Sequence, residues 1–181
     1  MYKVIIFDID GTLVDTDRML IETYKTLYAK YRKDLKNIDI DKIKTFSGPP
    51  IKETLLKEFP NEDQDKMLNE YKFYSHENYI KYVYVFPGVK EVLLKLKKDG
   101  YILTIATSKM RDASFFTLKL VGLENIFDLL VCSDDVINPK PDRESIDKII
   151  ANYNVSYKEV LFVGDNFINR FSIRFRIDNI I

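Results

Sequence analysis

The sequence predicts an α/β fold with a parallel sheet core, helices on both faces of the sheet and an inserted small α-helical domain. Two observations lead to this prediction. Strand and helix signals alternate from residue 84 onward, and such alternation is typical of parallel sheets. A block over residues 17–83 is helical throughout and directly follows the first strand signal. We therefore expect a core made of residues 1–16 and 84–181, interrupted by a helical cap over residues 17–83.

The apolar patterns of the first half identify one strand and several helices. Lys3–Ile9 is a short, β-branched apolar run that stops at Asp10-Gly11, which indicates a buried strand entering a turn. Within the helical block, Gly48-Pro49-Pro50 separates two helices, and Met67–Val83 is a further helix. The first helix of the block shows core-type side chains at helical spacing, at Met19, Leu20, Thr23, Leu27 and Tyr31.

The second half of the chain repeats a strand–helix rhythm. Gly100 and Gly122 each follow an amphipathic segment, at the position where a glycine commonly ends a helix. Open parallel sheets bind their ligands just beyond the carboxyl ends of their strands, so the residues after each strand matter most. The expected elements are helix Val89–Lys98, strand Tyr101–Thr107, helix Arg111–Val121, strand Leu129–Cys132, helix Arg143–Tyr153 and strand Val160–Val163.

The composition limits the classes of function. The 181 residues include 28 basic and 28 acidic side chains, so no net field favours nucleic acid or an anionic membrane. The single cysteine, Cys132, excludes an internal disulfide and suits a reducing compartment. No apolar stretch approaches membrane-spanning length, and Met1–Asp10 lacks the basic start of a signal peptide. We expect a cytoplasmic protein with a small-molecule partner, and the composition leaves the oligomeric state open.

Two carboxylates at the end of the first strand predict the chemistry. Asp8 and Asp10 are two positions apart on a strand, so their side chains leave the same face. At that distance they repel each other unless a cation lies between them, and a hard cation, Mg²⁺ above all, suits oxygen ligands. The cation keeps Asp8 ionised as a nucleophile, while Asp10 can give a proton to a leaving group and later take one from water. Gly11 permits the sharp turn that brings backbone N–H groups to a phosphate.

Three further features follow the later strands. Thr107 and Ser108 offer hydroxyl groups that can donate to a phosphate oxygen. Lys140 lies between two prolines, and its point charge on a stiffened loop suits a transferring phosphoryl group. Asp165 follows Gly164 and would be a further metal ligand. Each residue alone has an ordinary role as a turn residue, a helix N-cap or a solvated lysine, so the prediction depends on their order at four strand ends.

Four segments carry a family resemblance: Asp8-Ile9-Asp10-Gly11-Thr12-Leu13-Val14-Asp15, Thr107-Ser108, Lys140-Pro141 and Val163-Gly164-Asp165-Asn166. In this order they resemble the motifs of the haloacid-dehalogenase-like hydrolases. The resemblance implies a Rossmann-like core, a mobile helical cap, a Mg²⁺ cofactor and an aspartyl-phosphate intermediate on Asp8. It further implies acid/base catalysis by Asp10, phosphate binding by Thr107 and Lys140, and metal ligation by Asp8, Asp10 and Asp165.

A phosphatase for a small phosphorylated metabolite is the leading hypothesis for the function. Phosphoglycolate and pyrophosphate come first, because Ser47–Ile51 and Thr107–Asp112 resemble segments of phosphoglycolate phosphatases and the related inorganic pyrophosphatases. A phosphomutase of sugar phosphates would use the same Asp8 and Asp10 and remains an alternative. Arg111, just beyond the phosphate-binding loop, is a further candidate for contact with an anion.

The segment after Asp165 departs from the family pattern. Asn169 stands where the family has an acidic residue, and no small-residue helix or fifth strand follows before Ile181. This departure predicts weaker control of the metal and a core truncated at its C-terminal edge, so a catalytically impaired domain is the third hypothesis. A shifted reading frame would explain it, since codons for Asn169–Arg176 moved by one base can spell Ile-Asp-Leu-Ala-Ser-Gly-Leu-Gly, close to the family helix.

Overall fold

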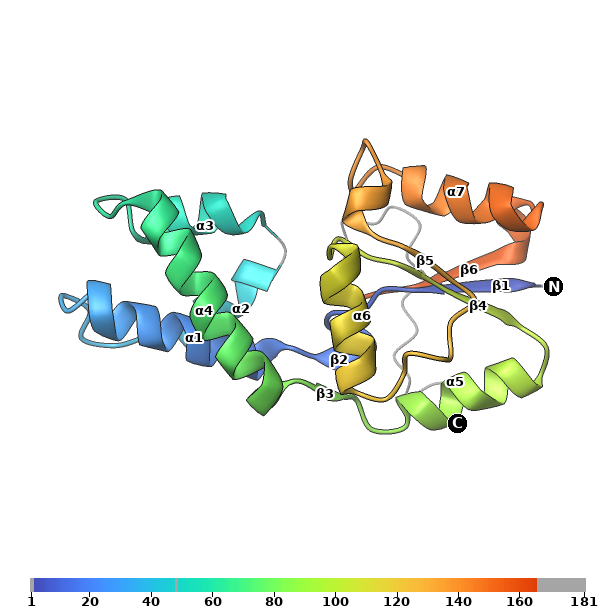
Figure 1. Cartoon of the computed structure of the whole chain (residues 1–181), viewed down its shortest axis with the longest axis horizontal. Coiled ribbons are helices and arrows are strands. Elements are labelled where there is room, and N and C mark those ends of the chain that lie inside the picture. Colours follow the sequence, from blue (N-terminus) through green and yellow to red (C-terminus); the bar gives the residue numbers. More distant parts are fainter. Residues whose placement is uncertain (1, 48, 166–181) are drawn as a thin grey trace. The chain divides into compact units, whose positions relative to one another are not determined.

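The chain divides into two compact units, one inserted into the other (Figure 1). The structure, a computed structural model, describes residues 2–47 and 49–165. One unit combines Met1–Asp15 with Tyr84–Ile181, and the other is Thr16–Val83. The expectations for Asn169, for a shifted reading frame over residues 169–176 and for a truncated edge of the core concern residues outside the described ranges.

The first unit is built on a parallel sheet, which confirms the predicted α/β class. Over the described residues this sheet has four strands in the order β5-β4-β1-β6, so β1 lies in its interior. Val4 at the start of β1 pairs with Ile102 on one side and Val160 on the other. The carboxyl ends of these strands therefore meet at one edge. The strands are β1 (Val4–Phe7), β4 (Ile102–Ala106), β5 (Leu129–Val131) and β6 (Val160–Val163).

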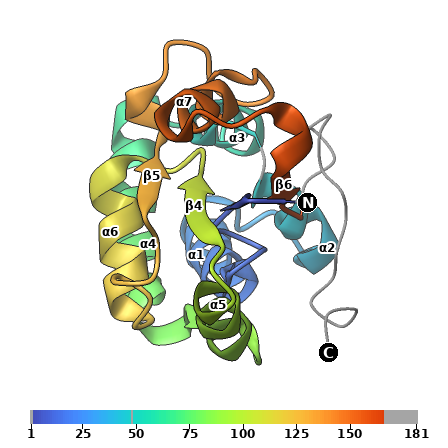
Figure 2. The same ribbon diagram turned by 90° about the vertical axis from the view of Figure 1, so that its right-hand side faces the viewer.

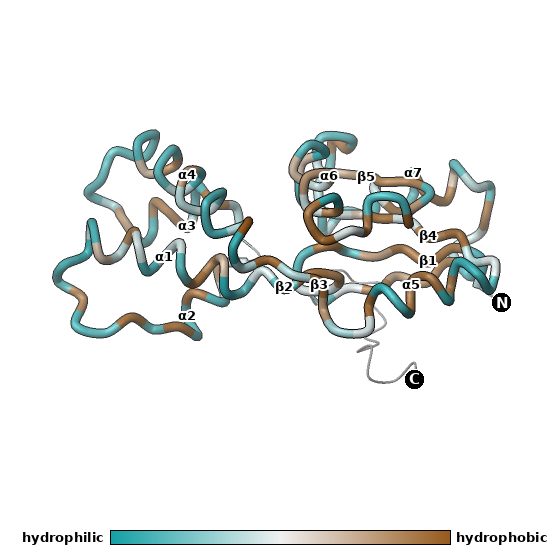
Figure 3. Tube along the Cα trace, turned by 60° about the horizontal axis from the view of Figure 1, so that its bottom comes forward, coloured by the Kyte–Doolittle hydropathy of each residue, from teal (hydrophilic) through white to brown (hydrophobic). Residues whose placement is uncertain are grey.

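Helices α5 (Val89–Lys98) and α7 (Glu144–Tyr153) cover opposite faces of the sheet (Figure 2). The alternation of side chains along β1 supplies both layers of the core. Ile6 belongs to the same buried cluster as Ile149 of α7, whereas Phe7 lines an apolar pocket with residues of α5. Figure 3 shows the apolar character of β1 and β4 between these helices. The other elements are α6 (Arg111–Leu120) and the 3-10 helices η2 (Ser133–Asp135) and η3 (Tyr157–Glu159).

Glycines end α5 and α6 as predicted. Gly100 has φ +87°, which an L side chain rarely adopts. Its N–H donates to Lys97 O at 3.0 Å, and the N–H of Tyr101 donates to Leu96 O at 3.1 Å. These two hydrogen bonds satisfy carbonyl groups that the helix end would otherwise leave unpaired.

A two-stranded antiparallel ribbon was not predicted from the sequence. β2 (Val14–Asp15) pairs with β3 (Tyr84–Val85), and the Tyr84 hydroxyl donates to Asp15 Oδ2 at 3.0 Å. Two residues are too few to show an alternating apolar pattern, so no sequence signal marks either strand. The ribbon brings together the two points at which the chain leaves and re-enters the first unit.

The second unit, Thr16–Val83, is helical. Its longest helix begins at Gln64, three residues before the predicted Met67, because the Asp63 side chain caps it by accepting the N–H of Lys66 at 2.8 Å. Among the described residues, no helix is both long and apolar enough to cross a membrane. The helices are α1 (Asp17–Tyr31), α2 (Ile40–Lys44), α3 (Ile51–Glu58) and α4 (Gln64–Tyr82), with the 3-10 helix η1 (Thr45–Ser47) after α2.

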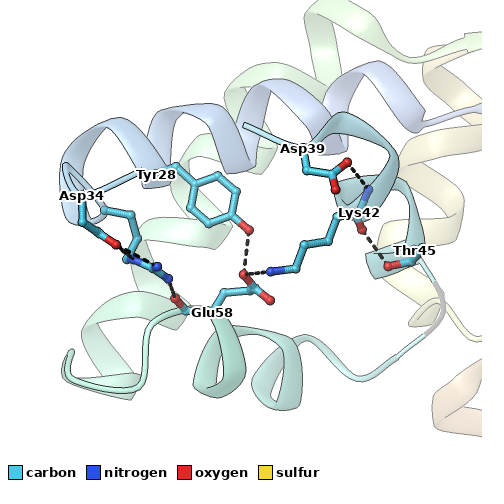
Figure 4. Close-up of polar contacts among 7 residues, drawn as sticks. Tyr28, Asp34, Asp39, Lys42, Thr45 and Glu58 are labelled. Carbon is cyan, nitrogen blue, oxygen red and sulfur yellow. Dashed lines mark hydrogen bonds and ion pairs between the residues drawn. The ribbon is translucent and has the colours of Figure 1, made fainter. Parts of the chain in front are cut away.

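A buried carboxylate ties three of these helices together (Figure 4). Glu58 of α3 is only 3% exposed. Its Oε2 accepts hydrogen bonds from the Tyr28 hydroxyl of α1 at 2.9 Å and from Lys42 Nζ of α2 at 2.7 Å. A buried charge is costly unless it is paired, so this carboxylate depends on both donors.

Lys42→Met tests that dependence. We expect the variant to lose about 1.5–3 kcal/mol of unfolding free energy, the range for a lost hydrogen bond to a charged group. The loss should lie at the low end of this range, because Lys42 is half exposed and water replaces part of the contact. Adding Glu58→Gln should recover part of the loss, because the buried group is then neutral. Urea unfolding measures the stability of the single and the double variant. Lys95→Met is the control: it removes an exposed ion pair with Asp99 and should leave the urea midpoint of unfolding unchanged. A double variant less stable than Lys42→Met would show that the buried charge is not the cause.

Candidate active site

The sequence-predicted residues lie at the carboxyl edge of the parallel sheet. Asp8 directly follows β1, Thr107 directly follows β4, and Asp165 comes two residues after β6. Phe7 pairs with Ile105 of β4 and with Val163 of β6, so the three strand ends are in register. The geometry of the edge then depends on how each side chain is held.

Lys140 holds the carboxylate of Asp8. Its Nζ lies 3.2 Å from Asp8 Oδ1 and donates to Ala106 O at 2.7 Å. The same Nζ lies over the ring of Phe162, 5.1 Å from the ring centroid. The lysine side chain is only 10% exposed. Burial raises the pKa of the Asp8 carboxyl, the charge of Lys140 lowers it, and the charge of Asp10 raises it further. The ion pair with Lys140 is therefore the main charge interaction that favours ionised Asp8.

Asp10 is held by a residue that the sequence analysis did not single out. Its Oδ2 lies 3.0 Å from Lys109 Nζ, and its Oδ1 is buried without a hydrogen-bond partner in the described structure. The signals for Lys109 were its place in the Thr107–Asp112 segment and its position two residues after Thr107, in the loop at the same sheet edge. Both signals could have suggested proximity to the site, but not which carboxylate the ammonium group contacts.

Gly11 and Asp165 are in direct contact. Gly11 has φ +73°, and a Cβ at this position would lie 2.3 Å from Asp165 Oδ2. The Asp165 carboxyl thus packs in the space that the glycine leaves. Desolvation raises the pKa of Asp165, and the negative charge of Asp8 raises it further, so these two carboxylates sense each other.

The hydroxyl residues after β4 differ in their surroundings. Thr107 is 4% exposed, and its Oγ1 accepts the N–H of Lys109 at 3.1 Å. Ser108 is exposed.

The guanidinium of Arg111 donates to Leu130 O at 3.2 Å and to the Asp135 carboxylate. Arg111 is therefore hydrogen-bonded to β5 and to the turn after it.

The acidic residues suit a divalent cation in their chemistry. Asp8 and Asp165 offer hard oxygen ligands whose mutual repulsion a cation relieves. Their oxygen atoms do not form a tight cluster with Asp10. In the described part of the chain, the set whose ligand atoms all lie within 4.8 Å of one another is Cys132, Asp134 and Asp135. Lys140 and Lys109 instead neutralise Asp8 and Asp10 separately.

Comparison with known proteins identifies the family. A family model described as haloacid dehalogenase-like hydrolase matches residues 5–169. The chain belongs to the haloacid dehalogenase-like hydrolases. The match spans both units and every residue of the sheet edge described above, and it confirms the resemblance noted in the sequence.

Individual relatives and solved structures are similar to this haloacid dehalogenase-like chain over most of its length. Pyrophosphatase PpaX of Bacillus velezensis is 38% identical over 164 residues, covering 90% of this chain and 74% of the relative. A Thermotoga maritima structure provisionally named β-phosphoglucomutase is 26% identical, with a TM-score of 0.76 over 91% of this chain and 76% of its own. A Haemophilus somnus structure described as a "predicted phosphoglycolate phosphatase" shares the fold, with 23% identity and a TM-score of 0.77 over 94% of this chain and 80% of its own.

These comparisons establish the class of reaction. The protein is a hydrolase, and the names of its relatives agree with hydrolysis of phosphate esters or anhydrides. Hydrolases of this family use a divalent metal, which agrees with the oxygen ligands of Asp8 and Asp165.

Gly11→Ala tests the contact between Gly11 and Asp165. The added Cβ must displace the carboxylate, so we expect hydrolysis of a phosphate substrate to fall by about 100-fold, as a misplacement near 1 Å can cause. Gly88→Ala is the matched control: Gly88 has φ +81°, but nothing lies within 4 Å of its Cβ position. Both variants should lose about 1–2 kcal/mol of stability from backbone strain. Equal activity in the two variants would show that the position of Asp165 is unimportant.

Proposed function

We propose that the chain is a Mg²⁺-dependent phosphatase that hydrolyses a small phosphorylated metabolite through an aspartyl-phosphate on Asp8. Pyrophosphate is the first candidate substrate and phosphoglycolate the second. The observation that carries the proposal is the pairing of Asp8 with Lys140, which places the Asp8 carboxylate beside a fixed cation at the sheet edge. Pyrophosphate comes first because PpaX relatives are 30–38% identical to the chain.

In the first step an Asp8 carboxylate oxygen attacks phosphorus, and the bond from phosphorus to the leaving oxygen breaks. Asp10 gives its proton to that oxygen as the electron pair arrives there. Lys140 stabilises the charge on the transferring phosphoryl group, and we assign Thr107, Ser108 and the N–H groups around Gly11 to its other oxygens.

In the second step water attacks the phosphorus of the aspartyl-phosphate. Asp10, now a carboxylate, takes a proton from that water, and the bond between phosphorus and Asp8 breaks. Phosphate leaves, Asp8 is again a free carboxylate and Asp10 again carries a proton. The cycle consumes one water and leaves the enzyme unchanged.

Asp8 and Asp165 would hold the Mg²⁺ ion, which when bound offsets the negative charge of the phosphate and the carboxylates. Ligation by the Asp10 side chain stays a prediction, and Lys109 competes for its Oδ2. The reduced, buried Cys132 is consistent with a cytoplasmic location. The formal net charge of zero is consistent with a small metabolite, rather than a nucleic acid, as the partner.

A phosphomutase is the second candidate, because the Thermotoga maritima structure named as one resembles the chain over most of its length. It would use Asp8 and Asp10 in the same roles but pass the phosphoryl group to a sugar hydroxyl. Release of inorganic phosphate from pyrophosphate, phosphoglycolate and hexose phosphates, with and without Mg²⁺, separates the two. Conversion of a hexose 1-phosphate to its 6-phosphate without net phosphate release would favour the mutase.

Asp8→Asn is the direct test of the nucleophile. It should abolish turnover while the circular dichroism spectrum stays unchanged, since the side chain keeps its size. Beryllofluoride should protect the unmodified protein from thermal unfolding and should not protect the variant. Substantial residual activity in Asp8→Asn would exclude an aspartyl-phosphate at this position.

Asp10→Asn tests the acid/base assignment. The variant should bind phosphate with little change but lose about 10²–10⁴-fold in kcat, the usual contribution of a general acid/base. Steady-state kinetics on the best substrate of the panel gives both quantities. An effect confined to KM would assign Asp10 to substrate binding instead.

A further inference from the structure

We propose that Lys109 is a positioning residue for Asp10: it fixes one oxygen of the carboxylate and leaves the other to carry the transferred proton. This inference rests on the proposed function, in which Asp10 is the general acid/base. It adds a second lysine to the site, because the sequence motifs identify only Lys140.

The backbone of Lys109 is fixed from two sides. Its N–H donates to Thr107 Oγ1 at 3.1 Å, next to the end of β4. Its carbonyl accepts the N–H of Ser133 at 3.0 Å, in the turn after β5. Two neighbouring strand ends therefore determine where the side chain of Lys109 starts.

The side chain is also confined. It is 16% exposed, and its ammonium group lies 3.0 Å from Asp10 Oδ2. Burying an ammonium group costs free energy unless an anion compensates, so the pair with Asp10 favours one position of both side chains. The position of the Asp10 carboxylate is thus coupled to the loop after β4.

The pairing makes the two oxygens of Asp10 different. An ammonium group only donates, so the oxygen that it contacts must act as an acceptor. The other oxygen, Oδ1, is buried and has no hydrogen-bond partner in the described structure. We therefore assign the catalytic proton of Asp10 to Oδ1, with Lys109 holding Oδ2.

Two aryl phosphates of nearly equal size test this assignment. Nitrophenolate leaves without help, whereas phenolate needs a proton, so only the second should depend on the acid. Under single-turnover conditions, Lys109→Met should slow phenol release from phenyl phosphate by about 10–100-fold, part of the usual effect of a general acid. Nitrophenol release from p-nitrophenyl phosphate should slow by less than about threefold, because the first step with this substrate does not use the Asp10 proton.

Matched variants separate positioning from other roles. Lys109→Arg keeps the charge and should restore most of the rate with phenyl phosphate. Lys119→Met removes an exposed lysine of α6 and should change neither rate. If Lys109→Met does not fold, Lys109→Gln, which keeps a donor without the charge, is measured in the same way and should show the same dependence on the leaving group.

Several results would overturn the proposal. An equal loss with both substrates, or a loss confined to KM, would make Lys109 a ligand of the phosphate. Full activity of Lys109→Met with phenyl phosphate would make the ion pair irrelevant. A crystal structure of the variant gives a readout independent of activity, and an unmoved Asp10 carboxylate would show that Lys109 does not position it. Absence of phosphate release by the unmodified protein from every phosphate substrate tested, with Mg²⁺ present, would instead count against the proposed function.

Discussion

The ammonium group of Lys140 lies where three parallel strands end. It contacts the carboxylate after β1 and the last carbonyl of β4, and it lies over an aromatic ring of β6. A lysine this buried needs an anion beside it, and a carboxylate this buried needs a cation, so neither group is stable at the edge without the other. The rest of the site is arranged around this pair. The sheet fixes the positions of the strand ends, and each buried charge there needs a side chain of opposite charge beside it.

The register of the sheet transmits this constraint to the other residues. Because Phe7 aligns with Ile105 and Val163, Asp8 comes level with the last residue of β4 and with the residue that follows β6. A slip of one residue in either pairing would turn the adjoining side chains to the opposite face. Gly11 adds a local constraint, since its missing Cβ is the space that Asp165 occupies. Three segments that are far apart in the sequence thus meet through strand pairing and one glycine contact.

The sequence predicts the regular elements well and the contacts between side chains poorly. The bounds of α5 and β6 follow from glycine stops and apolar runs, which are local signals. The earlier start of α4 was also readable, because Asp63 is an ordinary N-cap residue before the helix. The ribbon of β2 and β3 was not, since two-residue strands have no period. The pairing of Lys109 with Asp10 depends on where two loops meet, and no spacing rule encodes that.

The ribbon also bears on how quickly the chain can assemble. β1 must pair with β4, although Val4 and Ile102 are 98 positions apart, and closing a loop of that length costs conformational entropy. Residues 16–83 make up most of this loop. If the helical unit folds first and β2 pairs with β3, the remaining open chain between β1 and β4 is about 30 residues, since residues 16–83 no longer count toward the loop. The entropic cost of closure then falls by about 1 kcal/mol, so early folding of the insertion would accelerate formation of the sheet.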